Sequence, residues 1–275
     1  MQFWIPLASL SCAAAILMGA LSTSLSEPAP DARRGLALLQ HFRDSLPRHA
    51  GNGLRCTSCH LDDGKRGTAM PWIGVTARFP KYRARRGSLE SIEQRVNECI
   101  ARSLAGRMLP EDDPAMRDIV GFLETLRELP APERPDTVRV AGSATRGAVA
   151  YQPNCARCHG ADGAGTVAAP AVFGARSYSI GAGLARQKVL ATFLQSNMPV
   201  DQPGSLDAQV AADIAAWVLQ QSRQDHPGKE WDWPNGDVPA DVAYATDGAR
   251  RRGVPLPPSR PVLRRRVPPA SLPSR

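Results

Sequence analysis

The stretches Cys56-Thr57-Ser58-Cys59-His60 and Cys155-Ala156-Arg157-Cys158-His159 decide the fold of this chain. Each stretch places two thiols three residues apart and an imidazole directly after the second thiol. A sulfur-containing residue then follows each histidine at the same interval. Cys99 lies 39 residues after the first histidine, and Met198 lies 39 residues after the second. The chain of 275 residues therefore contains an internal repeat whose two copies start 99 residues apart.

The two motifs predict covalent attachment of haem. Two thiols at this spacing can bond the vinyl groups of a haem, and the adjacent imidazole can bind one face of its iron. A structural zinc site is the alternative for paired cysteines, but it needs four ligands, which further cysteine pairs do not supply here. We expect two covalently bound haem c groups in an all-α fold of two tandem class I cytochrome c domains. The attachment residues are Cys56, Cys59, Cys155 and Cys158, and the iron-binding histidines are His60 and His159.

Composition divides the chain into four segments: 1–26, 27–138, 139–247 and 248–275. The first contains an apolar run that ends in small residues before Glu27, which predicts a cleaved export signal and a periplasmic protein that is not an integral membrane protein after cleavage. An uncleaved anchor is the alternative. The second and third segments are the two cytochrome c domains. The last is rich in arginine and proline without periodicity, so we expect a disordered tail.

The net charge of +8 is unevenly distributed. Residues 248–275 contain eight arginines and no acidic residue, so the rest of the chain sums to zero. Residues 27–140 contain 19 basic and 16 acidic residues, and residues 141–247 contain 7 basic and 10 acidic residues. The first domain is therefore the better place for an anion to bind, and the basic tail by itself does not indicate nucleic-acid binding.

Apolar residues at helical spacing predict helices in both repeats. In the first repeat we expect a helix over 31–46, a second one that is capped by Ser88 and has an apolar stripe from Leu89 to Ile100, and a third over 114–129. In the second we expect them over 143–151, 187–195 and 207–221. We expect residues 226–244 to wrap over the surface with Trp231 and Trp233 as packing anchors. No strand-rich segment competes with this assignment.

The second axial ligands are predicted from the repeat. Met198 is the expected ligand of the second haem, because no other methionine occurs after Met116. Cys99 is the expected ligand of the first, because it matches the repeat and lacks a partner among the cysteines that follow the export signal. Met108 is its main rival. The remaining candidates are His41, His49 and Met70.

Two arginines surround this unpaired cysteine. Arg95 and Arg102 lie four residues before and three residues after Cys99, so all three share one face of a helix. Guanidinium groups beside a thiol favour the thiolate and can hold a small oxyanion. A structural alternative pairs these arginines with Glu90 or Glu98. Between 64 and 89 lie seven basic residues and no acidic one, which forms either a solvated face or a path for anions.

Several stretches resemble the dihaem thiosulfate dehydrogenase family. The resemblance covers about residues 31–245 and rests on Phe79-Pro80-Lys81-Tyr82-Arg83, Glu93-Gln94-Arg95-Val96-Asn97-Glu98-Cys99-Ile100-Ala101-Arg102-Ser103, Asn197-Met198-Pro199-Val200, Ala215-Ala216-Trp217-Val218 and Asp232-Trp233-Pro234. Some relatives have a lysine just before the methionine and exchange the two ligands. This chain has Asn197 there, which favours a constant His159/Met198 pair. Glu98 and Ala105 are smaller departures.

The resemblance implies a function for each domain. Residues 27–138 would be catalytic, with a haem bound by His60 and Cys99, and residues 139–247 would relay electrons. Two thiosulfate ions would be joined into tetrathionate, with Cys99, Arg95 and Arg102 as catalytic residues. The electrons would leave to a soluble acceptor such as a small cytochrome or a high-potential iron–sulfur protein.

Two other functions remain as alternatives. A Sox-type dihaem cytochrome would conjugate thiosulfate to a carrier protein, and Cys99 would serve there too. A non-catalytic electron-transfer cytochrome would use Met108 as the ligand of its first haem, which would leave Cys99 without a chemical role.

Overall fold

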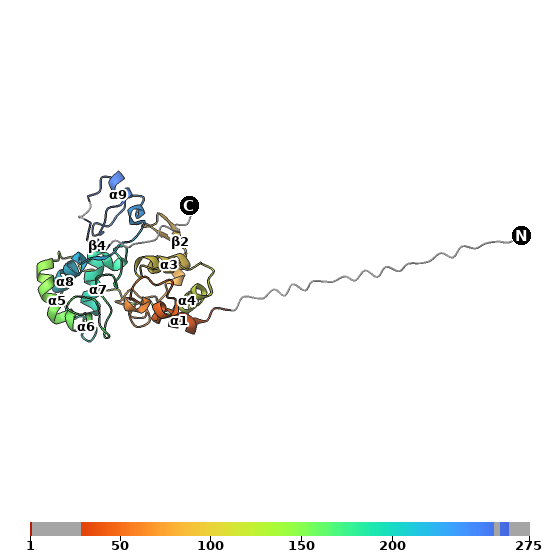
Figure 1. The fold of residues 1–275 in the computed structure, drawn as a ribbon, viewed down its shortest axis with the longest axis horizontal. Coiled ribbons are helices and arrows are strands. Elements are labelled where there is room, and N and C mark those ends of the chain that lie inside the picture. The colour runs from red at the N-terminus through yellow and green to blue at the C-terminus, as the bar shows by residue number, and fades with distance from the viewer. Residues whose placement is uncertain (2–28, 256–258, 264–275) are drawn as a thin grey trace.

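The computed structural model describes residues 1, 29–255 and 259–263 and places them in two helical lobes with a C-terminal segment across them (Figure 1). Apart from Met1, the predicted export signal lies outside the described residues. No helix in the described part of the chain has the length and apolar character needed to cross a membrane.

In the first domain, helix α1 (Ala32–Gln40) packs against α4 (Pro114–Thr125). Asp31 caps α1 by accepting hydrogen bonds from the backbone N–H groups of Arg33 and Arg34. The Asp31 N–H in turn donates to the Asp118 carboxylate at 2.8 Å, and the Arg34 side chain pairs with the same carboxylate. The helices touch at Gly35, where an added Cβ would lie 2.0 Å from the Asp118 carbonyl oxygen.

The second domain repeats this crossing. Helix α5 (Ala144–Tyr151) begins after its N-cap Ser143 and packs against α8 (Ala208–Gln220). Asp213 accepts hydrogen bonds from the Ser143 N–H at 2.6 Å and from the Arg146 side chain. A Cβ at Gly147 would lie 1.9 Å from the Asp213 carbonyl oxygen. The internal repeat is therefore a repeat of tertiary contacts.

Between the crossing helices of the first domain lie α2 (Phe42–Ser45), the 3₁₀ turns η1 (Cys56–Ser58) and η2 (Thr76–Arg78), and α3 (Ile92–Arg102). The hairpin of β1 (Lys81–Arg83) and β2 (Ser88–Glu90) precedes α3. The expected N-cap at Ser88 is wrong, because Ser88 pairs with Arg83 in this hairpin. Ser91 caps α3 instead, and Gln94 completes a reciprocal capping box that Ser88 could not form.

The second domain has an equivalent set of shorter elements. The π-helical turn η3 (Gln152–Ala156) and α6 (Arg157–His159) carry the second motif, and η4 (Gly183–Ala185) leads into α7 (Gln187–Asn197). Both domains share one continuous core of buried apolar residues, which runs from Leu38 in α1 to Leu219 in α8. The all-α prediction is confirmed, with only four short strands in the described part of the chain.

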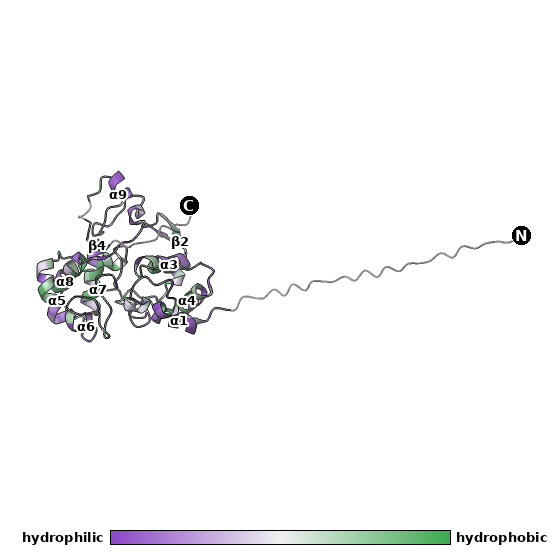
Figure 2. Cartoon of the chain, viewed as in Figure 1, coloured by the Kyte–Doolittle hydropathy of each residue, from purple (hydrophilic) through white to green (hydrophobic). Residues whose placement is uncertain are grey.

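The C-terminal segment forms β3 (Arg223–Gln224), η5 (Lys229–Trp231), α9 (Asp247–Arg251) and β4 (Val262–Leu263). Strand β4 pairs with β3 in parallel. Helix α9 is hydrophilic (Figure 2). Trp233 is a packing anchor as expected, whereas Trp231 is 49% exposed and is not. The expectation of disorder from 248 onward is wrong for the described part of the tail. This part of the tail pairs with β3 through β4 and buries Ala249. Such contacts join residues far apart in the sequence, so composition alone could not predict them.

We predict that Gly147→Ala lowers the melting temperature of the protein, because a methyl group at the α5–α8 crossing must push the helix backbones apart. Overpacking of this kind costs about 1–3 kcal/mol. Gly183→Ala is the matched control, since a Cβ at Gly183 would meet no atom within 4 Å. Equal melting temperatures for the two variants, measured by circular dichroism, would contradict the prediction.

Candidate functional site: an arginine-lined cavity beside Cys99

The two motif histidines have the same hydrogen-bonding environment. The Nδ1 atom of His60 lies 2.5 Å from the Met70 carbonyl oxygen, and that of His159 lies 2.7 Å from the Pro170 carbonyl oxygen. Since a carbonyl oxygen only accepts, Nδ1 carries the proton and Nε2 is left with a free lone pair in each ring. Burial lowers the pKa of both rings, to about 4 for His60. Both imidazoles are therefore neutral, as a metal ligand must be.

The motif cysteines also suit haem attachment. None of the four forms a disulfide with a described residue. Cys56 begins the turn η1 and Cys59 directly follows it, whereas Cys155 lies in η3 and Cys158 lies in α6 beside His159. Burial is the main cause of raised pKa values, to about 12 for Cys59 and about 11 for Cys155. No group of three or more His, Cys, Asp or Glu side chains among the described residues could hold a metal ion, so neither motif belongs to a tetrahedral zinc site. The residues present thus fit a haem in each domain.

The candidates for the second ligand of the first haem separate by position. Cys99 is half-buried on α3, close enough to Cys56 and Cys59 that its charge raises the pKa of both. Met108, its rival, is 54% exposed. Met70 contributes its backbone carbonyl on the His60 side. Likewise, His41 is exposed, and the His49 ring lies 2.9 Å from the Arg107 carbonyl oxygen.

In the second domain, Met198 directly follows α7 and packs half-buried against the main core. Its neighbour Asn197 is fully buried and joins the domains. The Asn197 amide accepts a hydrogen bond from the Thr68 hydroxyl at 2.8 Å, and it donates to the carbonyl oxygens of Thr68 and Phe193, both at 3.1 Å. Every polar atom of this side chain is thereby engaged with protein.

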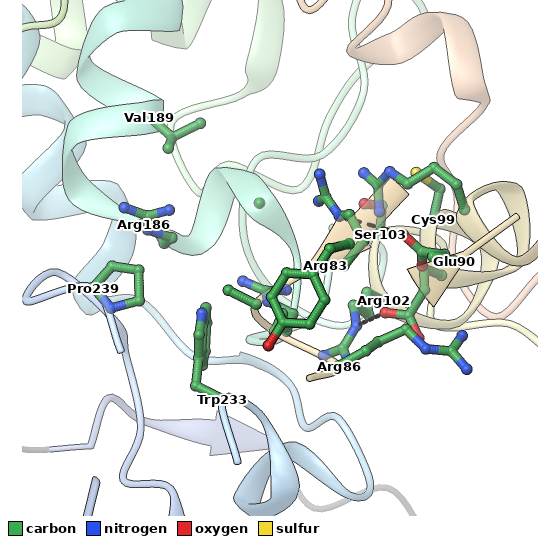
Figure 3. A pocket seen from close by; sticks show the side chains of 16 residues that line it. Arg83, Arg86, Glu90, Cys99, Arg102, Ser103, Arg186, Val189, Trp233 and Pro239 are labelled. Atoms are coloured by element: carbon green, nitrogen blue, oxygen red, sulfur yellow. Dashed lines mark hydrogen bonds and ion pairs between the residues drawn. The ribbon is translucent and has the colours of Figure 1, made fainter. Parts of the chain in front are cut away.

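A cavity of about 310 Å³ opens beside Cys99. Three parts of the chain enclose it: the β1–β2 hairpin and α3 of the first domain, the start of α7, and the C-terminal segment with Trp233 and Pro239 (Figure 3). Six arginines line it, namely Arg83, Arg85, Arg86, Arg95, Arg102 and Arg186. The predicted trio of Cys99, Arg95 and Arg102 therefore does meet at one cavity.

Arg102 is a structural cation. Its two terminal nitrogens donate to the two carboxylate oxygens of Asp232 at 2.9 and 2.8 Å, and its Nε pairs with Glu98. Burial alone would lower the pKa of Arg102, but Glu98 and Asp232 raise it. The structural alternative for this arginine is therefore the observed one. Three of its five N–H donors are engaged in these bonds, which hold the C-terminal segment on α3.

Arg95 has a different environment. It lies one turn before Cys99, and its side chain makes no hydrogen bond or ion pair with any described residue. The pKa of Arg95 is raised, mainly by the nearby charge at Cys99 and further by Glu90 and Glu98, while burial opposes the rise. A half-buried guanidinium with unused donors beside a sulfur atom is suited to bind an anion.

The basic run between 64 and 89 supplies three more of the lining arginines. The Nε atom of Arg83 lies 3.3 Å from the Oε2 atom of buried Glu90. Arg85 donates to the Gly181 carbonyl oxygen at 2.7 Å and stacks on Trp233. Arg86 is exposed and makes no ion pair with a described residue. Arg86 therefore offers an exposed positive charge at the cavity, whereas Arg83 and Arg85 hold the cavity wall in place.

Two lining residues were not expected from sequence. Arg186 comes from the second domain and pairs with Asp241 at 2.8 Å, and Trp233 comes from the C-terminal segment. Trp233 could have been expected here, because it belongs to the stretch Asp232-Trp233-Pro234 that resembles the family. Arg186 belongs to no motif, so there was no reason to expect it from the sequence.

Comparisons with known proteins agree with this architecture. Residues 47–126 match the family model "SoxA/TsdA, cytochrome c domain", and residues 142–218 match "Cytochrome C oxidase, cbb3-type, subunit III". Two cytochrome c domains, each with its own attachment motif, establish two covalently bound haem c groups.

Similar proteins cover most of the chain. A thiosulfate dehydrogenase of Psychrobacter arcticus is 37% identical over 76% of this chain and 68% of its own length. One of Allochromatium vinosum is 36% identical over 84% of this chain and 89% of its own length. The solved structure of thiosulfate dehydrogenase TsdBA from Marichromatium purpuratum superposes with a TM-score of 0.68 at 27% identity, over 72% of this chain and 47% of that one.

We predict that Arg102→Gln loosens the C-terminal segment, because it leaves the half-buried Glu98 without its ion-pair partner and buried Asp232 with only the longer contact to Arg85 at 3.9 Å. Removing one partner of a buried ion pair costs about 3–5 kcal/mol. Limited proteolysis should then cut residues 225–255 faster, and the melting temperature should fall. Arg95→Gln on the same helix is the control and should resemble the parent protein in both measurements; equal behaviour of the two variants would contradict the assignment.

Proposed function

Because this chain belongs to the thiosulfate dehydrogenase family, we propose that it joins two thiosulfate ions into tetrathionate in the cavity beside Cys99. The chain is an oxidoreductase with two haem c groups. The observation that carries the proposal is the Arg95 guanidinium, which is half-buried beside Cys99 and makes no hydrogen bond or ion pair with a described residue. Thiosulfate is a small dianion, and a partly desolvated guanidinium binds such ions strongly.

The charge of the cavity suits a reaction between two anions. Two dianions repel each other, and the repulsion rises as water is excluded from between them. Arg95 next to the cysteine and Arg86 at the exposed rim can each offset part of this repulsion. Arg83, Arg85 and Arg102 are held by acidic or carbonyl partners and keep the wall in place. The cavity volume of about 310 Å³ leaves room for small ions.

Cys99 can provide the site of sulfur chemistry. Its thiolate and the outer sulfur of one thiosulfate form a sulfur–sulfur bond, and two electrons are released. The outer sulfur of a second thiosulfate then attacks the sulfur that the first one donated. Tetrathionate leaves and the Cys99 thiolate is regenerated, so two thiosulfate ions yield one tetrathionate and two electrons. When bound, the two haems supply one-electron acceptors for this oxidation.

The proposal assigns one role to each domain. His60 and Cys99 would bind the iron of the first haem, and His159 and Met198 that of the second. The Asn197 amide supports a constant His159/Met198 pair, because its hydrogen bonds to Thr68 and Phe193 hold the chain directly before the methionine. We propose that electrons leave through the second haem in the periplasm, to a small cytochrome or a high-potential iron–sulfur protein.

We predict that purified protein forms tetrathionate from thiosulfate with ferricyanide as the acceptor and no partner protein. Cys99→Gly should lose this activity while retaining both haems by pyridine haemochrome assay, because the attacking sulfur is gone. Activity in the variant comparable to that of the parent protein would refute a catalytic cysteine. Strict dependence on an added carrier protein would favour the Sox-type alternative.

Low-temperature electron paramagnetic resonance should show one low-spin ferric signal of the His/thiolate type and one of the His/Met type. Cys99→Gly should lose the first signal and keep the second. Two His/Met signals in the parent protein would instead favour the electron-transfer alternative with a Met108 ligand.

We predict that Arg95→Gln lowers kcat/KM for thiosulfate by about 10- to 100-fold, because a hydrogen bond to a charged group contributes about 1.5–3 kcal/mol. Arg107→Gln, on the loop after α3 and away from the lining residues, is a matched control with the same charge change. An equal effect of both variants would mean that Arg95 acts only through the overall charge.

A further inference from the structure

Two carboxylates lie among the residues that line the cavity beside Cys99, and their environments differ (Figure 3). Glu98 on α3 forms an ion pair with Arg102. Burial alone would raise the pKa of Glu98, but the charge and the hydrogen bond of Arg102 lower it. Glu98 is therefore a fixed anion of the cavity wall. Glu90, the last residue of β2, is the second carboxylate, and it is held in another way.

The Glu90 side chain is buried with little support for a negative charge. It is 1% exposed, and the Nε atom of Arg83 lies 3.3 Å from its Oε2 atom. This contact lacks the alignment of a hydrogen bond, and Oε2 accepts no hydrogen bond from a described residue. A buried carboxylate is stable as an anion where hydrogen bonds and a counter-charge together replace its water. Of the two lining carboxylates, Glu90 is therefore the one that can accept a proton.

The charges that face Glu90 come from β1, from the turn after it and from α3. Burial has the largest effect on Glu90 and raises its pKa, and Glu98 on α3 acts in the same direction. Arg95 on α3, Arg83 on β1 and Arg86 in the turn oppose the rise. All three arginines also line the cavity. Glu90 and an anion in the cavity therefore compete for the same positive charges.

A dianion that enters the cavity changes the balance at Glu90. The ionised carboxylate would repel it, and the repulsion is strong where water is partly excluded. The carboxylate would also continue to neutralise Arg83. A proton on Glu90 removes the repulsion and leaves the charge of Arg83 for the anion. This proton comes from solvent through the cavity that Glu90 lines, and no other bond forms or breaks.

We propose that Glu90 takes up one proton when a sulfur oxyanion enters the cavity, and that it thereby sets the pH range in which the cavity binds such ions. The inference rests on the proposed function, because it assumes that thiosulfate and tetrathionate occupy this cavity. Glu90 acts through its charge and does not react with either ion. By linkage, an ion that favours protonated Glu90 binds more weakly as the pH rises, by up to about tenfold per pH unit.

Tetrathionate binding to the fully oxidised holoprotein tests this proposal without turnover, because no electron donor is present. Isothermal titration calorimetry in two buffers of different ionisation enthalpy measures the protons that are taken up. The parent protein should take up as much as one proton per tetrathionate, and its affinity should fall from about pH 5 to 7. Glu90→Gln resembles the protonated side chain, so it should take up none and bind more tightly than the parent at neutral pH. Glu128→Gln, at a 90% exposed side chain, is the control with the same charge change and should resemble the parent.

The KM for thiosulfate provides a second readout. It should rise with pH in the parent protein and remain constant and lower in Glu90→Gln, whereas loss of a merely structural contact would raise it at every pH. Arg83→Gln decides the matter even where Glu90→Gln does not fold. Loss of this counter-charge further raises the pKa of Glu90, so proton uptake should move to higher pH.

Three results would overturn the proposal even if the protein forms tetrathionate from thiosulfate. They are binding by the parent without proton uptake, undiminished uptake in Glu90→Gln, and an unchanged pH range in Arg83→Gln. Tetrathionate binding with the expected uptake in a protein that does not oxidise thiosulfate would support the role of Glu90 and contradict only the proposed reaction. No tetrathionate binding at any pH would overturn both.

Discussion

The buried contact between Arg102 and Asp232 is the interaction on which the cavity depends. It joins residues 130 positions apart and closes α3 against the C-terminal segment. Tyr244 donates to the same carboxylate at 2.6 Å, and Trp233 follows Asp232 into the wall, where Arg85 stacks on its ring. Without this pair, Cys99 would lie on an open helix face. A charge buried at this position is stable only because both of its carboxylate partners are buried with it.

The protein uses arginines in two physically different ways. Arg102 and Arg146 form ion pairs with the buried carboxylates of Asp232 and Asp213 and so hold distant parts of the chain together. Arg95 is half-buried at the cavity and makes no ion pair with a described carboxylate. A guanidinium of this second kind is suited to bind an anion that comes from outside the chain. In our proposal that anion is thiosulfate.

The two domains share one framework of helix contacts and differ in local residues. Gly35 with Asp118 and Gly147 with Asp213 make the same close helix crossing, each with an arginine on the carboxylate. The two domains differ at the residue that lies 39 positions after the motif histidine, which is Cys99 in the first domain and Met198 in the second. Asn197 ties the second copy to the first through Thr68, so the two domains share one core and one interface.

The sequence by itself predicted the all-α class, the two haem motifs and most of the helices, and it singled out Cys99, because motif spacing and helical periodicity can be read along the chain. Only the tertiary structure decided that Arg102 pairs with Asp232 while Arg95 makes no ion pair with a described residue, that Met108 faces solvent, and that Arg260 of the tail contacts the Ala185 carbonyl. These outcomes depend on pairs such as Arg102–Asp232 and β3–β4, whose members are distant in sequence. Whether a charge faces water or a partner is set by that long-range packing.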